Sequence, residues 1–153
     1  MNIEVTNQKS QNAVALKKES ATMAEISVIA TEGLQKVFGF LTQNGVEIAG
    51  APYLAYSNGN ADFTKFDVEL GIPVSEGVAV SGEFYISKTC EGKAVTATYK
   101  GAYKDIDAAY TALMEYMAEN KLESTGVYYD YYLNNPADTP ESELLTQVVF
   151  PIK

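Results

Sequence analysis

The sequence lacks residues on which several common kinds of site depend: it has no histidine, no arginine, no tryptophan and only one cysteine. Without histidine, the chain cannot form Ser-His-Asp or Cys-His nucleophilic systems, and it cannot ligate zinc or haem iron through imidazole. Because all 11 basic residues are lysines, the side chain best suited to bidentate contacts with phosphate or guanine is missing. The single cysteine, Cys90, cannot form an internal disulfide.

Charge and hydrophobic patterning exclude further classes of protein. The net charge of −9 repels a nucleic-acid backbone, so direct nucleic-acid binding is not expected. No apolar run approaches the ~18 residues of a membrane-spanning helix, and the first residues do not begin a signal peptide. We therefore expect a cytoplasmic protein without membrane association. The acidic pairs Asp105 with Asp107 and Glu141 with Glu143 fit solvated surface, and no metal or cofactor is expected.

Hydrophobic periodicity predicts an α+β fold built from two halves with the same order of elements: strand, helix, strand, strand. Apolar residues over 26–41 recur with the spacing of one buried helical stripe, and Asn44-Gly45 is typical of a helix end. The expected elements are strands at 13–16, 53–56 and 66–74 with a helix at 26–41, and strands at 94–99, 127–133 and 144–152 with a helix at 104–119.

The two halves also align residue by residue, which indicates an internal repeat. Gly50 precedes Tyr56 by the same interval as Gly126 precedes Tyr132. We therefore predict two strand-helix-strand-strand repeats, related by a pseudo-twofold axis, with a ligand cleft between them. The single domain, residues 1–153, would divide into an N-terminal repeat at about 10–75, a bridging strand at about 77–90 whose alternation is clearest over 78–86, and a C-terminal repeat at about 93–153.

The most informative segment is residues 127–133 (VYYDYYL), in which four tyrosines surround one aspartate. Its aromatic bias is typical of a strand, and strand side chains alternate between faces. Tyr128, Asp130 and Tyr132 are therefore expected on one face. A carboxylate between two phenol rings favours an aromatic or lipophilic cation. The alternative is a strand aspartate whose hydrogen bonds are satisfied on a wet face.

Four further residues are candidates for the same ligand site, one of them weaker than the others. Tyr56 takes the place of Tyr132 in the first repeat, so it would form a facing wall of the cleft or else pack in the core with its hydroxyl at the rim. In the bridging strand, Glu83 and Tyr85 share a face, where a second acid would strengthen cation binding; the alternative is an exposed strand. The acid of the first repeat, Glu69, is a weaker candidate because it does not align with the aspartate.

Two segments carry a family signature. Residues 99–110 (YKGAYKDIDAAY) contain a Gly-x-Tyr turn at the start of a helix, and residues 130–136 (DYYLNNP) read acidic-x-Tyr-Leu-Asn-x-Pro, followed by ELLT at 143–146 and FPI at 150–152. Together they resemble the GyrI-like small-molecule-binding domain, which is also the effector-binding domain of AraC-type and MerR-type multidrug-responsive regulators. The resemblance covers about residues 10–153, and the second signature is the specific one.

The resemblance implies an aromatic-lined cleft that binds amphipathic, often cationic, compounds beside an acidic residue. By position that residue is Asp130, although the family usually has glutamate, so the carboxylate here is one methylene shorter. Tryptophans that are common in the family's pockets are also missing. Residues 1–12 are too few and too polar for a helix-turn-helix, so an effector domain standing alone is expected.

We therefore predict a protein that senses or sequesters a hydrophobic, cationic compound, and its expected ligand contacts are Asp130, Tyr132, Tyr128, Tyr56, Glu83 and Tyr85. One alternative is a hydrolase, since stand-alone relatives hydrolyse reactive cyclopropane-bearing compounds; Asp130 and Tyr132 would then be general base and acid. Another is a protein-interaction module that modulates DNA gyrase or a transcription regulator. Binding is preferred over catalysis because the family's tryptophan and glutamate are replaced.

Overall fold

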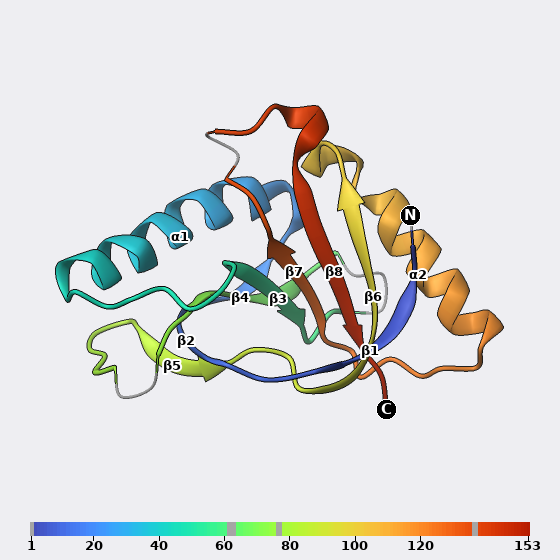
Figure 1. Ribbon diagram of the computed structural model, residues 1–153, viewed down its shortest axis with the longest axis horizontal. Helices are drawn as coiled ribbons and strands as arrows, with labels where there is room; N and C mark the ends of the chain where they lie inside the picture. The colour runs from blue at the N-terminus through green and yellow to red at the C-terminus, as the bar shows by residue number, and fades with distance from the viewer. Residues whose placement is uncertain (1, 61–63, 76–77, 136–137) are drawn as a thin grey trace.

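The computed structural model describes residues 2–60, 64–75, 78–135 and 138–153 (Figure 1). One eight-stranded antiparallel sheet carries the two α-helices found in these residues, which confirms the expected α+β class. None of the described helices is long and apolar enough to cross a membrane. Pro136, at the end of the second signature, lies outside the described residues.

The observed elements follow the expected order, with one strand added near the beginning of the chain. The strands are β1 (Glu4–Gln8), β2 (Asn12–Ala21), β3 (Tyr53–Ser57), β4 (Phe66–Pro73), β5 (Tyr85–Lys88), β6 (Gly92–Lys100), β7 (Tyr128–Tyr132) and β8 (Leu145–Pro151); the helices are α1 (Ile26–Gln43) and α2 (Asp107–Glu119). Short 3-10 helices occur at Met23–Glu25, Tyr103–Asp105 and Glu141–Glu143. The polar sequence of β1 gives no strand signal, and this segment becomes a strand by pairing with β6.

The Tyr-rich strand β7 lies at the centre of the sheet. The strand order is β1-β6-β8-β7-β3-β4-β2-β5, so β7 is bordered by β8 and β3. In the β3–β7 pair, Leu54 lies opposite Asp130 and Tyr56 lies opposite Tyr128. Residues that are far apart in the sequence therefore meet at the middle of the sheet.

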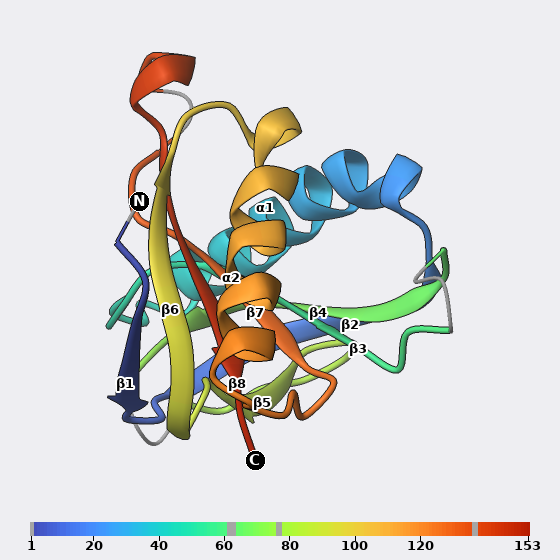
Figure 2. The ribbon, with the colours of Figure 1, turned by 90° about the vertical axis from the view of Figure 1, so that its right-hand side faces the viewer.

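Both helices pack on one face of the sheet, α1 over β2 and β4 and α2 over β6 and β8 (Figure 2). Each helix buries residues with the same i, i+4, i+8 spacing, as the apolar stripes predict: Gly33, Val37 and Leu41 in α1, and Ala109, Leu113 and Met117 in α2. A Cβ at Gly33 would lie 2.7 Å from Cδ2 of Leu70, so glycine permits the close approach of α1 to β4. In the strand order, β3 and β7 lie between the strands that α1 covers and the strands that α2 covers.

The opposite face carries none of the described helices, and we call it the helix-free face. Its core contains Tyr53 and Tyr131 together with small residues such as Ala13 and Ala94. The backbone N–H of Cys90 donates a hydrogen bond to the Tyr131 hydroxyl over 3.2 Å, which ties the β5–β6 connection to this face. Tyrosines therefore supply much of the packing on both sides of the sheet.

The expected bridging strand over 78–86 is wrong for residues 78–84, which are not a strand. Only β5 pairs with the sheet, through β2. Phe84 instead stacks on Phe40 of α1, with ring centroids 4.4 Å apart, and Val78 and Val80 pack against the same core. The alternation thus reflects an irregular segment that covers the core, without a partner strand. Gly77, at the start of this expected strand, lies outside the described residues.

Candidate functional site

The candidate site lies at the middle of the helix-bearing face, where the carboxylate and two of the four tyrosines of β7 are located. Tyr128 and Tyr132 pack against the core under α1, whereas Tyr129 and Tyr131 belong to the helix-free face. Asp130 lies on the same face as Tyr128 and Tyr132 and is only 3% exposed. The predicted division of this strand into two faces is confirmed.

The carboxylate of Asp130 is buried with incomplete hydrogen bonding. The hydroxyl of Tyr110, on α2, donates a hydrogen bond to Oδ2. The other oxygen, Oδ1, has no hydrogen-bond partner among the described residues. A buried polar atom without a partner costs roughly 1–3 kcal/mol, and more when it is charged. Such an atom in a native structure requires a physical explanation.

Burial raises the pKa of Asp130 to about 6, and the hydroxyls of Tyr110 and Tyr56 act against this rise. The pKa values of these two tyrosines are themselves raised well above the usual range, first by burial and then by the negative charge of Asp130. The phenols therefore stay protonated beside the carboxylate. Above the pKa of Asp130, the site holds one negative charge in apolar surroundings.

A second polar atom without a partner lies nearby on β8. Thr146 is fully buried, and its Oγ1 has no hydrogen-bond partner among the residues that the structure describes. Thr146 pairs with Tyr132 in the β7–β8 register, and Val148 pairs with Asp130. Thr146 and Asp130 are therefore diagonal neighbours on one face of adjacent strands. Their unpartnered oxygens belong to the same part of the molecule.

Aromatic rings surround these two polar side chains. The ring of Tyr103 meets that of Tyr132 edge-on, with centroids 5.4 Å apart. Phe150 contacts Tyr128 edge-on at 4.7 Å and stacks with Tyr110 at 5.9 Å between centroids. The faces of such rings attract cations. We define the helix-face site by these features; its residues are Tyr56, Tyr103, Tyr110, Tyr128, Asp130, Tyr132 and Thr146.

The sequence pattern alone does not identify Tyr110 or Thr146 as members of this site. Tyr110 belongs to the apolar side of the second helix, where it is partly buried beside the core. The hydroxyl group of Tyr110 is the one signal in the sequence for such a role, because a phenol packed against a core usually finds a hydrogen-bond partner. Thr146 stands within the signature segment at 143–146, but its face becomes known only from the pairing of β7 with β8.

Two of the predicted ligand residues lie outside the helix-face site. Glu83 is exposed and forms an ion pair with Lys36 of α1, with 3.7 Å between Oε1 and Nζ. Tyr85 lies on the helix-free face, where its hydroxyl donates a hydrogen bond to Glu69 over 2.7 Å. The structure thus brings together the four other predicted residues and leaves these two apart.

Neither metal binding nor thiol chemistry finds support in the described residues. They contain no group of three or more Cys, Asp or Glu side chains that could hold a metal ion. Cys90 is buried, which raises the pKa of its thiol to about 11. Little thiolate therefore forms near neutral pH, and reactive cysteines depend on the thiolate.

The family model for the GyrI-like small molecule binding domain matches residues 1–153. The chain belongs to the GyrI-like family. This confirms the family that the two sequence signatures predict. No curated protein sequence matches this GyrI-like chain.

Solved structures share the fold of this GyrI-like chain. The C-terminal domain of EcmrR has a TM-score of 0.83 and 17% identity, over 99% of this chain and 97% of that chain. In the EcmrR–DNA complex, with a TM-score of 0.82 and 17% identity, the match covers 99% of this chain but only 57% of the EcmrR chain. SAV2435 bound to tetraphenylphosphonium has a TM-score of 0.68 and 12% identity, over 100% and 94% of the two chains. A hydrolase from Listeria innocua has a TM-score of 0.63 and 9% identity, over 99% and 91%.

Proposed function

We propose that this GyrI-like protein binds a hydrophobic cation at the helix-face site, with Asp130 as its counter-charge. The observation that carries the proposal is the buried Oδ1 atom of Asp130, which lacks a partner among the described residues and is surrounded by tyrosines. A bound cation would neutralise the carboxylate while the rings contact its apolar surface. The complex of the relative SAV2435 with tetraphenylphosphonium, a lipophilic cation, supports this ligand class.

We further propose that the ligand cleft lies between two repeats related by a pseudo-twofold axis. The strand order supports this arrangement, because β3, β4 and β2 follow one another on one side of the centre as β7, β8 and β6 do on the other. The ends of the two helices also support this arrangement. Asn44 ends α1 and Asn120 ends α2, and the backbone N–H of each donates a hydrogen bond to the carbonyl oxygen four residues earlier. The axis would pass near the pair of Leu54 and Asp130.

Binding would require side chains to move, because aromatic residues fill this cleft. Tyr56 is only 7% exposed and Asp130 is 3% exposed. Tyr103 and Tyr132 are half-buried, and their rings contact each other at the site. Rotation of these two rings about their side-chain bonds would open a path to the carboxylate without moving the sheet.

Replacing Asp130 with Asn tests the counter-charge. We expect the Asp130→Asn variant to bind methyltriphenylphosphonium about 10–100-fold more weakly than the wild type, because a hydrogen bond or contact with a charged group contributes about 1.5–3 kcal/mol. Neutral triphenylphosphine oxide, which has a similar shape, should bind both proteins equally. Isothermal titration calorimetry measures all four affinities.

Glu115→Gln is the matched control, because Glu115 is exposed on α2 and its replacement removes the same unit of charge. This variant should bind the cation as the wild type does. Equal cation affinity of the wild type and Asp130→Asn would contradict the proposal. Undetectable binding of the cation to the wild type at millimolar concentration would contradict it as well.

The affinity for the cation should also depend on pH. Since burial raises the pKa of Asp130 to about 6, a cation that binds at lower pH must displace a proton from the carboxylate. The affinity should therefore be roughly tenfold weaker at pH 5 than at pH 8, and constant well above the pKa. Calorimetry across this range measures the profile. The Asp130→Asn variant should show no such step, and a flat wild-type profile would rule Asp130 out as the counter-charge.

A further inference from the structure

A second carboxylate is held in a defined position on the helix-free face. Glu69, on β4, accepts hydrogen bonds on both oxygens. The hydroxyl of Tyr53 donates to Oε2 over 2.7 Å, and the hydroxyl of Tyr85 donates to Oε1 over 2.7 Å. Ser87 Oγ lies 2.9 Å from Oε2 and 3.0 Å from Oε1. These donors come from β3 and β5, so the carboxylate is fixed from two sides.

The same carboxylate lines a cavity of about 330 Å³ that also contains positive charge. Lys17 and Lys88 line the cavity, together with the ring of Tyr129. Lys17 lies directly opposite Glu69 in the β2–β4 register, yet the two form no ion pair, as judged over the described residues. One negative and two positive side chains therefore face one cavity in a chain whose net charge is −9.

The hydrogen-bond network around Glu69 determines what this cavity offers to a ligand. An ionised carboxylate can only accept hydrogen bonds, so the hydroxyls of Tyr53, Tyr85 and Ser87 must donate to it. Tyr85 and Ser87 line the cavity together with Glu69, and their hydroxyl oxygens keep lone pairs, which makes this end of the cavity negative and rich in acceptors. A primary ammonium, with three N–H donors, is complementary to it. A lysine ammonium is in turn complementary to a carboxylate.

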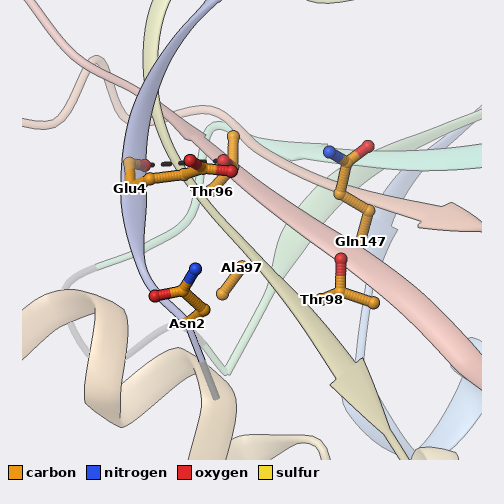
Figure 3. A pocket seen from close by; sticks show the side chains of 6 residues that line it. All are labelled: Asn2, Glu4, Thr96, Ala97, Thr98 and Gln147. Carbon is orange, nitrogen blue, oxygen red and sulfur yellow. Dashed lines mark hydrogen bonds between the residues drawn. The ribbon is translucent and has the colours of Figure 1, made fainter.

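The corresponding place in the other half of the sheet has a different pair of residues. A smaller cavity of about 200 Å³ lies there over β1, β6 and β8; its lining residues are Asn2, Glu4, Thr96, Ala97, Thr98 and Gln147 (Figure 3). Thr98 lies opposite Gln147 in the β6–β8 register, where Lys17 lies opposite Glu69 in the β2–β4 register. Of these two cavities, only the larger has a lysine opposite a glutamate. The uncharged pair of Thr98 and Gln147 shows that such strands pair without these charges.

We propose that the cavity at Glu69 binds a small zwitterion that carries an ammonium, a carboxylate and an apolar group, which is the chemistry of an aromatic amino acid. The ammonium lies against Glu69, the carboxylate against Lys17, and the apolar group against Tyr129 and Val127. The volume is that of a small-ligand pocket. This site is on the opposite face of the sheet from Asp130, so it does not depend on the proposed function.

Three probes of similar size separate the contributions of the two charged ends. L-phenylalanine carries both charges, 2-phenylethylamine lacks the carboxylate, and 3-phenylpropionate lacks the ammonium. We expect L-phenylalanine to bind at least about tenfold more tightly than either of the others, because each loses one charge-assisted contact. Ligand-observed NMR titrations measure the three affinities.

Variants of this chain assign each end of the ligand to a residue. Glu69→Gln should abolish the binding of L-phenylalanine and of 2-phenylethylamine. Lys17→Gln, at an exposed position, should weaken L-phenylalanine about tenfold and leave 2-phenylethylamine unchanged. Asp130→Asn should leave the binding of all three probes unchanged, so the failure of one site is distinguishable from the failure of the other.

Several results would overturn the proposal. They are the absence of L-phenylalanine binding at millimolar concentration, equal affinities for the three probes, and loss of binding in Asp130→Asn. If Glu69→Gln does not fold, because three hydroxyls have lost their charged acceptor, Lys17→Gln decides alone. Unchanged affinity for L-phenylalanine in that variant overturns the proposal.

Discussion

The Asp130→Asn variant should be more stable than the wild type at pH 8 by about 3 kcal/mol in the absence of ligand. Burial raises the pKa of Asp130 from 3.8 to about 6, so ionisation is less favourable in the folded protein than in the unfolded chain. Between these two values the folded state binds more protons, and stability therefore falls as the pH rises. The contribution is fully present below the unfolded pKa and is lost as the pH passes the folded pKa.

Urea unfolding at pH 4 and pH 8 measures this effect as a difference between variant and wild type. The advantage of Asp130→Asn should grow by about 2–3 kcal/mol between the two pH values. Asp67→Asn provides a control of opposite sign, because hydrogen bonds from Asn58 and from the backbone of Ser20 lower the pKa of the half-buried Asp67. An advantage of Asp130→Asn that stays constant with pH would show that burial does not raise this pKa.

A residue that opposes folding and favours binding fits the proposed function. The unpartnered Oδ1 of Asp130 destabilises the ligand-free protein, and a cation would remove that penalty on binding. Binding sites often keep such features because function requires them, even though a neutral residue would make the protein more stable. The stability gain of Asp130→Asn and its loss of cation affinity would therefore have the same physical cause.

Most helices and strands of this fold could be predicted from local periodicity. The stripe that buries Val37 and Leu41 and the alternation along β7 depend only on spacing within one segment. β1 could not be predicted, because its polar residues form a strand only through pairing with β6. Residues 78–84 show the opposite case. Their apolar and polar residues alternate as in a strand, but no strand of the sheet pairs with them.

The candidate site could be predicted only in part. Alternation places Asp130 on the face of Tyr128 and Tyr132, but its burial depends on side chains from other elements, above all Tyr110. Tyr85 is predicted for this site because it shares a face with Glu83 in the expected bridging strand, but residues 78–84 form no strand and the Tyr85 hydroxyl bonds to Glu69 on the helix-free face. Glu69 is only a weaker candidate from the sequence, and its hydrogen bond with Tyr85 becomes known only once β5 is seen to lie beside β2. The ligand contacts and the hydrolase and protein-partner alternatives stay predictions.

Gly71→Ala should destabilise the protein by about 2–4 kcal/mol, through overpacking and the loss of a buried hydrogen bond. A Cβ at Gly71 would lie 2.6 Å from the hydroxyl oxygen of Tyr53 and 2.7 Å from its ring. Tyr53 is fully buried opposite Gly71 in the β3–β4 register, so the ring has no free space into which to move. Any displacement would also lengthen its 2.7 Å hydrogen bond to Glu69.

Gly39→Ala is the matched control, because a Cβ at Gly39 would meet nothing within 4 Å. Alanine in this helix should stabilise the protein by about 0.5–1 kcal/mol. Urea unfolding compares both variants, and a wild-type midpoint for Gly71→Ala would mean that Tyr53 can move. Because Tyr53 orients Glu69, Gly71→Ala should also weaken L-phenylalanine binding while it leaves cation binding at Asp130 intact. The two faces of the sheet would then respond separately to one change.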